Sequence, residues 1–402
     1  MHMVPFSFTP TRAAALSRLA AFAPRTGRHY AANRNTDEGP GPRGGVSMLS
    51  PYVRFRLLSE EEILTDTLQR FSLSTAEKFV QEVFWRAYFK GFLETRPAIW
   101  ERYLRVLENI NRTPAYDDAI AGRTGIDCFD CWVAELQDTG YLHNHARMWF
   151  ASIWIFTLRL PWQLGADFMY RHLIDGDPAS NTLSWRWVGG LHTKGKTYLA
   201  RSANIAQYTN GRFEPKGLAS VAVTLEEEPL PAAMPVPFAI AQWPEGAFGL
   251  LVTTEDLSLP DGVLPDSIAI AAQPVAKPGG QESALAHRFK SDALSDAAKH
   301  FGKIGAPVVQ LTALDRQSVL QWCQTSRISM VAVAYAPVGP EASVLDDIEA
   351  HLAQHDISLL RVRRRYDSLT WPHATKGFFA LKEKIPSLLQ KLNIQSQQAE
   401  LF

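Results

Sequence analysis

The sequence is poor in features that mark secreted or membrane proteins. Its 402 residues include only three cysteines, too few for a disulfide framework, which indicates a reducing compartment. No apolar run approaches the roughly 20 residues that cross a bilayer. Acidic and basic side chains balance at 41 each, so net charge selects no class of partner. We therefore expect a monomeric cytoplasmic protein without a membrane partner, in a bacterial cytosol.

Acidic residues are scarce in the first 35 positions, which are rich in Arg, Ala and Ser. This composition is compatible with an organellar transit peptide. The alternative, which we favour, is an amphipathic first helix capped by Thr9 or Thr11. Its apolar positions at helical spacing are Ala15, Leu16, Leu19 and Phe22.

Strand-like alternation is scarce between residues 57 and 213, where helical periodicity takes its place. Segments with apolar residues at three- and four-residue spacing are Leu58–Phe71, Ala76–Leu93, Ile99–Ile110 and Phe129–Leu136. Eight of the eleven tryptophans lie before residue 190. We therefore expect an all-helical, tryptophan-rich domain over residues 1–213.

The pattern changes in the second half. Four prolines and an acidic cluster in Glu226–Pro237 predict a stiff, solvated linker over residues 214–236. The short apolar runs that follow are Phe238–Trp243, Gly249–Thr254, Ser267–Ala272, Pro307–Leu311, Met330–Tyr335 and Ile357–Val362. Helix-length segments between them are Ala284–Phe301, Asp315–Gln324 and Ser343–His355. This alternation predicts a Rossmann-like α/β domain with a doubly wound parallel sheet over residues 237–402.

Small and hydroxyl-bearing residues gather in GGVSMLSPY (Gly44–Tyr52). Glycines let a backbone approach a ligand, and Ser47 and Ser50 can donate to phosphate oxygens where a helix begins after Pro51. A capped loop without a ligand explains the same residues, and on these residues alone it is the simpler interpretation.

A second segment, QEVFWRAYF (Gln81–Phe89), carries side chains that could read a base and a phosphate. At helical spacing, Glu82, Trp85 and Arg86 share one face with Phe89. An amphipathic helix with an incidental Glu–Arg pair is the simpler interpretation.

A third segment, TGYLHNHARMWF, again groups polar side chains. Residues at helical spacing within it are His143, Asn144, Arg147 and Met148. His143 and His145 suggest a metal, but no third ligand has matching spacing, so we expect none. The single CxxC of Cys128 and Cys131 is likewise weak for zinc or iron–sulfur, and we expect both cysteines to pack as small apolar groups.

The fourth segment, LIDGDPASNTLSWRW, combines carboxylates, an amide and indoles. These residues are Asp175, Asp177, Asn181, Trp185 and Trp187. The six bases between positions 185 and 217 are Arg186, Lys194, Lys196, Arg201, Arg212 and Lys216. The same stretch contains one acid, Glu214. A basic strip that also carries aromatic residues can hold a phosphate backbone. A solvated charged face explains the strip equally well.

Taken together, the four segments resemble the flavin-binding domain of the cryptochrome/photolyase family, over roughly Pro10 to Phe213. VSMLSPYVRF is similar to the family's TSxLSPYLxxG loop around the flavin pyrophosphate, and QEVFWRAYF to its ELIWREFY helix. TGYLHNHARM resembles TGWxHNRxRM, and LIDGDPASNTLSWRW matches LIDGDxAxNxxxWxW along its whole length. The resemblance implies an all-helical domain of photolyase type that binds FAD non-covalently.

The resemblance also assigns cofactor-binding roles. The residues that would contact FAD are Tyr30, Ser47, Met48, Leu49, Ser50, Arg86, Arg147, Asp175, Asp177 and Asn181. Arg147 and Asp175 would form a salt bridge beside the isoalloxazine. Asp177 would bind the flavin's polar edge and ribose region, and Asn181 would face the flavin N5.

Other residues would face DNA by the same resemblance. Those that would meet a flipped pyrimidine dimer are Glu82, Trp85, Asn144, Met148 and Trp187. Enzymes for (6-4) photoproducts typically carry His where this chain has Asn144 and Met148, so the pair implies cyclobutane dimers. The residue at Asn181, where plant cryptochromes have Asp and insect ones Cys, implies the same.

The chain departs from the family pattern at several positions. Trp185 and Trp162 match the first two members of the family's electron-relay triad, but the third falls on Ala119. Either photoreduction is slow or another aromatic such as Tyr116 substitutes. Val46 replaces a usual Thr, which removes one phosphate hydroxyl, and Ala87 replaces a usual Glu.

The order of domains departs as well. The family places an α/β antenna domain first, whereas here LLVTTEDLSLP and YDSLTWPHATKGFFALKEKIP, in the second half, resemble the start and end of that domain. This implies a domain-level circular permutation, which is tolerable if the termini lie close together. No residue set in Phe238–Phe402 identifies an antenna chromophore.

The function implied by the resemblance is that of a deoxyribodipyrimidine photo-lyase, a carbon–carbon lyase. It would repair cyclobutane pyrimidine dimers in DNA through light-driven electron transfer from reduced FAD. Two alternatives remain open: a cryptochrome-like blue-light photoreceptor without repair activity, and a non-enzymatic flavoprotein that binds single-stranded DNA.

Overall fold

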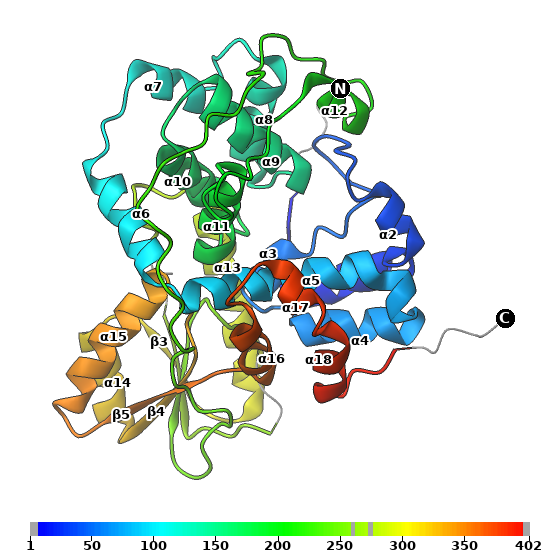
Figure 1. Cartoon of the computed structure of the whole chain (residues 1–402). Coiled ribbons are helices and arrows are strands. Elements are labelled where there is room, and N and C mark those ends of the chain that lie inside the picture. The colour runs from blue at the N-terminus through cyan, green and yellow to red at the C-terminus, as the bar shows by residue number, and fades with distance from the viewer. Residues whose placement is uncertain (1–6, 259–261, 272–275, 397–402) are drawn as a thin grey trace.

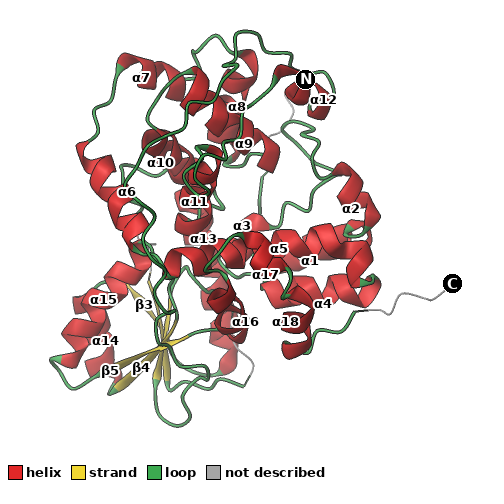
Figure 2. Cartoon of the chain, in the orientation of Figure 1, coloured by secondary structure: helices red, strands yellow, loops and turns green. Residues whose placement is uncertain are grey.

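Helices build the first half of the chain and a five-stranded sheet flanked by helices builds the second (Figures 1 and 2). A computed structural model describes residues 7–258, 262–271 and 276–396. The α-helices of the first half are α1 (Arg12–Phe22), α2 (Arg28–Asn33), α3 (Ser50–Arg54), α4 (Glu60–Arg70), α5 (Leu73–Glu94), α6 (Ala98–Asn109), α7 (Pro114–Ile120), α8 (Asp127–Thr139), α9 (Asn144–Ser152), α10 (Trp162–His172), α11 (Pro178–Val188) and α12 (Ser202–Tyr208). A π-helical turn, η2 (Ile153–Thr157), continues α9.

Within its described residues, the second half supplies the strands and six further helices. The strands are β1 (Gly249–Val252), β2 (Ser267–Ala271), β3 (Val308–Leu311), β4 (Met330–Ala334) and β5 (Ser358–Val362). The α-helices are α13 (Ala284–Phe301), α14 (Arg316–Ser326), α15 (Pro340–Ala353), α16 (Arg365–Thr370), α17 (Phe378–Lys382) and α18 (Ile385–Lys391). Short 3-10 turns are η1 (Ala23–Arg25), η3 (Gly302–Ile304) and η4 (Trp371–His373). No helix in the described ranges is long and apolar enough to cross a membrane.

Helix starts follow local capping chemistry. Thr11 caps α1 by accepting from the backbone N–H of Ala14, as one of the two predicted caps. Leu16 is 42% exposed, so its predicted place on the buried face of α1 is wrong. At α4, Ser59 and Glu62 form a reciprocal capping box, which fixes where that helix begins.

All strand pairs of the sheet are parallel, in the order β3-β2-β1-β4-β5. From β1 the chain runs through β2 to β3 at one edge of the sheet. It then crosses back to β4 on the other side of β1, which confirms the predicted doubly wound sheet. The predicted strand Phe238–Trp243 is wrong, because only Ile240 pairs, bridging to Val362, the last residue of β5. Prolines at 235, 237 and 244 bracket this segment and interrupt a hydrogen-bond ladder.

The two halves share their hydrophobic cores. Tyr366, Ala374 and Phe378, which follow the sheet, are buried in the same cluster as residues of α5 and α8–α11. Figure 1 shows the C-terminal helices α16–α17 lying against α5. At Gly91 of α5, a Cβ would come within 2.7 Å of the Trp371 Cα, so only glycine permits this approach. The predicted boundaries at residues 213 and 237 stay a prediction, and helices beyond the sheet complete the helical core.

The predicted linker lies along the helical half. It has no helix or strand between residues 214 and 236, and its backbone is tied to the end of α5. Met234 donates its N–H to the Thr95 carbonyl (2.9 Å), and the Arg96 guanidinium donates to the Pro231 carbonyl (3.1 Å). These bonds hold the crossing from helical half to sheet in one path.

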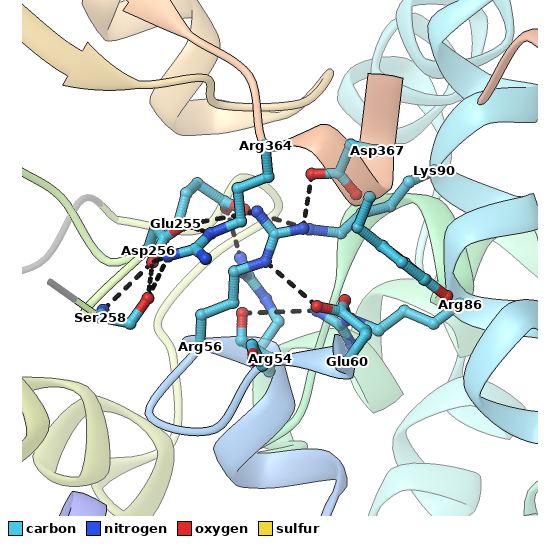
Figure 3. Close-up of polar contacts among 12 residues, drawn as sticks. Arg54, Arg56, Glu60, Arg86, Lys90, Glu255, Asp256, Ser258, Arg364 and Asp367 are labelled. Atoms are coloured by element: carbon cyan, nitrogen blue, oxygen red, sulfur yellow. Dashed lines mark hydrogen bonds and ion pairs between the residues drawn. The ribbon is translucent and has the colours of Figure 1, made fainter. Parts of the chain in front are cut away.

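A buried ionic network joins the halves where β1 ends (Figure 3). Arg54 contacts Glu255 at 2.7 Å, and Arg56 contacts Asp367 at 2.5 Å and Asp256 at 3.4 Å. Burial alone would raise the pKa of Asp256, but Arg364 and Arg56 outweigh it and lower that pKa. The carboxyl end of β1 lies at the switch point between β1 and β4, where open α/β sheets bind ligands. Here, side chains of the helical half fill that position.

Candidate functional site

The predicted ion pair between α9 and the turn before α11 is formed. The Arg147 guanidinium lies 2.8 Å from Oδ2 of Asp175, and the Ser50 hydroxyl donates to the same oxygen at 2.5 Å. Arg147 also donates to the Leu142 carbonyl at 2.9 Å, which holds its guanidinium in place. Within the described residues, Oδ1 of Asp175 is buried without a hydrogen-bond partner. A buried acceptor without a donor fits a bound ligand that donates a hydrogen bond.

Asn181, on α11, is buried with its amide orientation fixed. Its Nδ2 donates to the Ala166 carbonyl on α10 at 2.9 Å. A carbonyl can only accept, so this bond assigns the amide nitrogen to the α10 side. The amide oxygen therefore forms the opposite end and can accept from a ligand.

Glu82 on α5 faces α2. The side chain is accessible to solvent, yet surrounding protein atoms raise its pKa above the ordinary range of a glutamate. Burial, and then the charge of Glu82, raise the pKa of Tyr30 on α2. The structure thus brings two predicted residues together, and Arg34, which the sequence did not single out, supplies a positive charge beside Glu82.

The loop before α3 is held by the protein itself. A Cβ on Gly45 would meet the Asn33 carbonyl oxygen at 2.8 Å, so this glycine permits close packing on α2. The backbone N–H of Gly44 donates to the Glu38 carboxylate at 2.7 Å. Met48 has φ of +53°, a strained value for a residue with a side chain. Among the other predicted loop residues, Leu49 is buried and Ser47 is half-buried.

Asp177 is engaged in the junction between the halves. Its Oδ1 accepts from the Ser180 N–H at 2.7 Å and caps α11. Its Oδ2 lies 3.5 Å from Arg86 and 3.7 Å from Lys90. Burial alone would raise the pKa of Asp177, but these cations hold it well below its ordinary range. Sequence reasoning missed Lys90 because one lysine on a long helix carries no motif. The flavin roles of Asp177 and Arg86 stay predictions.

The predicted lesion-facing residues lie on three elements. Asn144 is exposed at the first position of α9, and Met148 is half-buried one turn later. On α5, the Trp85 ring stacks on Phe378 of α17 with centroids 3.8 Å apart and planes 11° apart. Trp187 stacks on Tyr198 at 5.6 Å.

The two predicted relay tryptophans have different ring neighbours. Trp185 is buried and lies edge-to-face with Trp154 at 6.1 Å, and Trp154 lies edge-to-face with Tyr116 at 6.0 Å. Trp162 instead stacks with Tyr103 at 5.7 Å and donates its indole N–H to Glu227. Ala119 is buried in the same core as Tyr116. Sequence reasoning missed Trp154, which lies outside the quoted motifs.

The histidines and cysteines of this region have structural surroundings. The rings of His143 and His145 bond the backbone carbonyls of Arg34 and Asn35, which ties α9 to the end of α2. Burial lowers the pKa of His143 to about 3, so the ring is neutral. Cys128 is buried as expected, whereas Cys131 is exposed, so the expectation that both cysteines pack as small apolar groups is wrong for Cys131.

Comparison with known proteins finds matches to the helical half of the chain. Residues 79–218 match the family model for the FAD-binding domain of DNA photolyase. Deoxyribodipyrimidine photo-lyases are 29% identical over 208 residues in Alkalihalophilus pseudofirmus, 36% over 152 in Streptomyces griseus and 32% over 214 in Thermus thermophilus. These matches cover 50%, 37% and 52% of this chain and 42%, 33% and 49% of the relatives. The chain thus spans less than half the length of the relatives that it matches.

Two solved structures also align with about half of the chain. A class III photolyase from Agrobacterium tumefaciens aligns with a TM-score of 0.44 at 23% identity, covering 50% of this chain and 43% of that one. A Synechocystis cryptochrome aligns with a TM-score of 0.43 at 23% identity, covering 52% of this chain and 45% of that one.

Proposed function

Because the chain belongs to the photolyase/cryptochrome family, we propose that it binds FAD non-covalently and repairs cyclobutane pyrimidine dimers in DNA under blue light. Reduced FAD, when bound, supplies the light-excited electron that splits the cyclobutane ring. The chain's own residues bind the cofactor, hold the flipped dimer and exclude water. The observation that carries the proposal is the Asp175 carboxylate, held by Arg147 and Ser50 through one oxygen and buried without a partner at the other.

Two residues support a flavin at this position. Asp175 Oδ1 would accept from a ring N–H, since it has lost water without gaining a protein donor. The Asn181 amide, oriented by its bond to Ala166, would present an acceptor to the ring. An acceptor there favours a protonated ring nitrogen over a bare one and adds no charge.

The dimer would lie between α5 and α9. Glu82 is accessible and carries a raised pKa, which favours its protonated form as a donor to a pyrimidine carbonyl. Asn144 would add a second polar contact, and Met148 and Trp85 apolar ones. Such a set favours repair over a photoreceptor, which needs no pocket for a dimer.

The electron path to the flavin is proposed to begin at Trp185. Beyond it, Trp154 contacts the Trp185 ring and Tyr116 follows Trp154, whereas the expected Trp162 stacks with Tyr103. These edge-to-face contacts support Trp154 as the second member, and Trp162 stays the alternative.

The domain order is proposed to be a circular permutation of the family's order. The helical half precedes the sheet, and α16–α18 return from the sheet to the helical core. The tethered crossing between residues 214 and 236 makes such an order compatible with one compact assembly.

The experiment compares repair in blue light and in darkness. Purified protein with reduced FAD is incubated with an oligonucleotide that contains one thymine dimer, and repaired strands are counted. Substituting Glu82→Ala should reduce repair while FAD stays bound, and Glu108→Ala, which removes an exposed acid from α6, should change neither. Loss of FAD in E82A would show that Glu82 belongs to the cofactor site. Binding of undamaged single strands without repair would favour the DNA-binding flavoprotein.

A further inference from the structure

Helix α17 lies behind the tryptophan that is proposed to face the lesion. Phe378 is buried beneath Trp85, whose indole stays partly exposed. This stack fixes the plane of Trp85 from the inner side, so a partner can approach only from the outer side. The next residue, Phe379, is 75% exposed. Helix α17 therefore presents an aromatic side chain to solvent one residue after the phenylalanine that stacks on Trp85.

The segment that carries α17 is basic, although the whole chain is neutral. Residues 371–391 contain four lysines (Lys376, Lys382, Lys384 and Lys391) and one acid, Glu383. Lys376 and Lys384 are exposed, and Lys382 pairs with Glu77 of α5 at 3.0 Å. Burial first, and then the charges of Lys384 and Lys391, lower the pKa of His373. The local field at this surface is therefore positive.

A second basic segment reaches the same turn of α5 from the α11 side. Tyr88 contacts Trp85 at 5.4 Å and Phe378 at 5.7 Å, and its hydroxyl hydrogen-bonds the His192 ring at 2.8 Å. The loop around His192 carries exposed Lys194 and Lys196. Two segments that are distant in sequence therefore flank Trp85, and each brings exposed lysines.

We propose that α17 and the turn before it form one rim of a face that binds duplex DNA, with the loop around His192 as the opposite rim. Lys376 would neutralise a backbone phosphate, and Phe379 would stack on a base left unpaired when the dimer leaves the duplex. Positive charge that tracks the backbone, together with accessible aromatic rings, is the combination that nucleic-acid surfaces use. This inference rests on the proposed function, which supplies DNA as the partner.

The test measures the affinity of the full chain for a labelled duplex with and without one thymine dimer, at salt concentrations between 50 and 200 mM. Substituting Lys376→Gln should weaken binding to both duplexes and reduce the slope of log K against log salt by about 0.9, the value of one phosphate contact. The matched control Lys299→Gln removes an exposed lysine from the last turn of α13 and should leave the slope unchanged.

Phe379 is tested by its effect on damaged DNA alone. F379A should weaken binding to the dimer duplex by roughly tenfold, the lower part of the range for losing one stacked base, and leave the undamaged duplex unaffected. F379Y keeps the ring and should restore affinity. An unchanged slope in K376Q, or equal affinities for F379A and wild type, would overturn the inference. If the variants show these effects but wild type repairs no dimer in light, the repair proposal fails and the DNA-binding rim stands.

Discussion

Arg56 offers the sharpest test of how the two halves are held together. Its guanidinium lies 2.5 Å from Asp367 and 3.4 Å from both Asp256 and Glu60, with every partner nearly inaccessible to solvent. R56M removes this cation and leaves the buried carboxylates without enough positive charge to balance them. Removing one member of a buried ion pair costs about 3–5 kcal/mol. That is a large share of the roughly 5–15 kcal/mol that stabilises a typical folded protein.

The penalty should depend on pH. Cationic neighbours that include Arg56 lower the pKa of Glu60 and of Asp256 although burial would raise both. A carboxyl group whose pKa is lowered in the folded state stabilises the fold at pH values above its pKa in the unfolded chain. That stabilisation is lost as pH falls through the pKa of the folded state. Equilibrium urea unfolding, followed by tryptophan fluorescence, should therefore show a larger loss in R56M at pH 7 than near pH 4.

The matched control is R316M. Arg316 pairs with Asp347 at 3.4 Å on the surface, where both side chains are more than half exposed. Its loss should cost at most about 1 kcal/mol. If R56M lost no more than R316M, or lost the same amount at both pH values, the ionic network would not hold the junction.

Three further predictions concern the cofactor, the electron path and pH. D175N should weaken FAD binding by about 2 kcal/mol or more, because Arg147 loses its charged partner; retained flavin absorbance after gel filtration would refute this. W154F should slow blue-light reduction of bound FAD more than W162F does, as followed by the flavin absorbance, and the reverse order would restore Trp162 as the second relay member. Burial raises the pKa of Glu341 to about 7, so its contribution to stability is lost as pH rises from about 4.5 through 7. E341Q should therefore gain stability over wild type at pH 8 but not near pH 4, in the same urea assay.

Much of the fold follows from local patterns. The segment Ala284–Phe301 was predicted with the bounds that α13 has, because capping by Ser283 and helical periodicity are local properties. Five of the six predicted strands formed for the same reason, since short buried apolar runs alternate with helices. The segment Phe238–Trp243 failed because its composition resembles a strand while flanking prolines prevent the ladder.

The site was less accessible from sequence where it depends on long-range packing. The Arg147–Asp175 pair could be predicted because both residues lie in motifs that the family resemblance names. The stack of Phe378 on Trp85 could not be predicted, because Trp85 precedes the sheet strands in the sequence and Phe378 follows them. No local pattern records such a contact. The same holds for Lys90, whose role comes only from meeting Asp177 and Glu255 in the folded chain.

Repair of a defined lesion tests the central claim most directly. Protein with fully reduced FAD is mixed with a duplex that carries one thymine cyclobutane dimer, divided into illuminated and dark samples, and assayed for intact thymines. The account predicts restoration of the duplex in blue light, none in darkness, and a strong reduction in E82A with FAD still bound. A chain that binds FAD and the damaged duplex, yet restores no dimer in light, would contradict it.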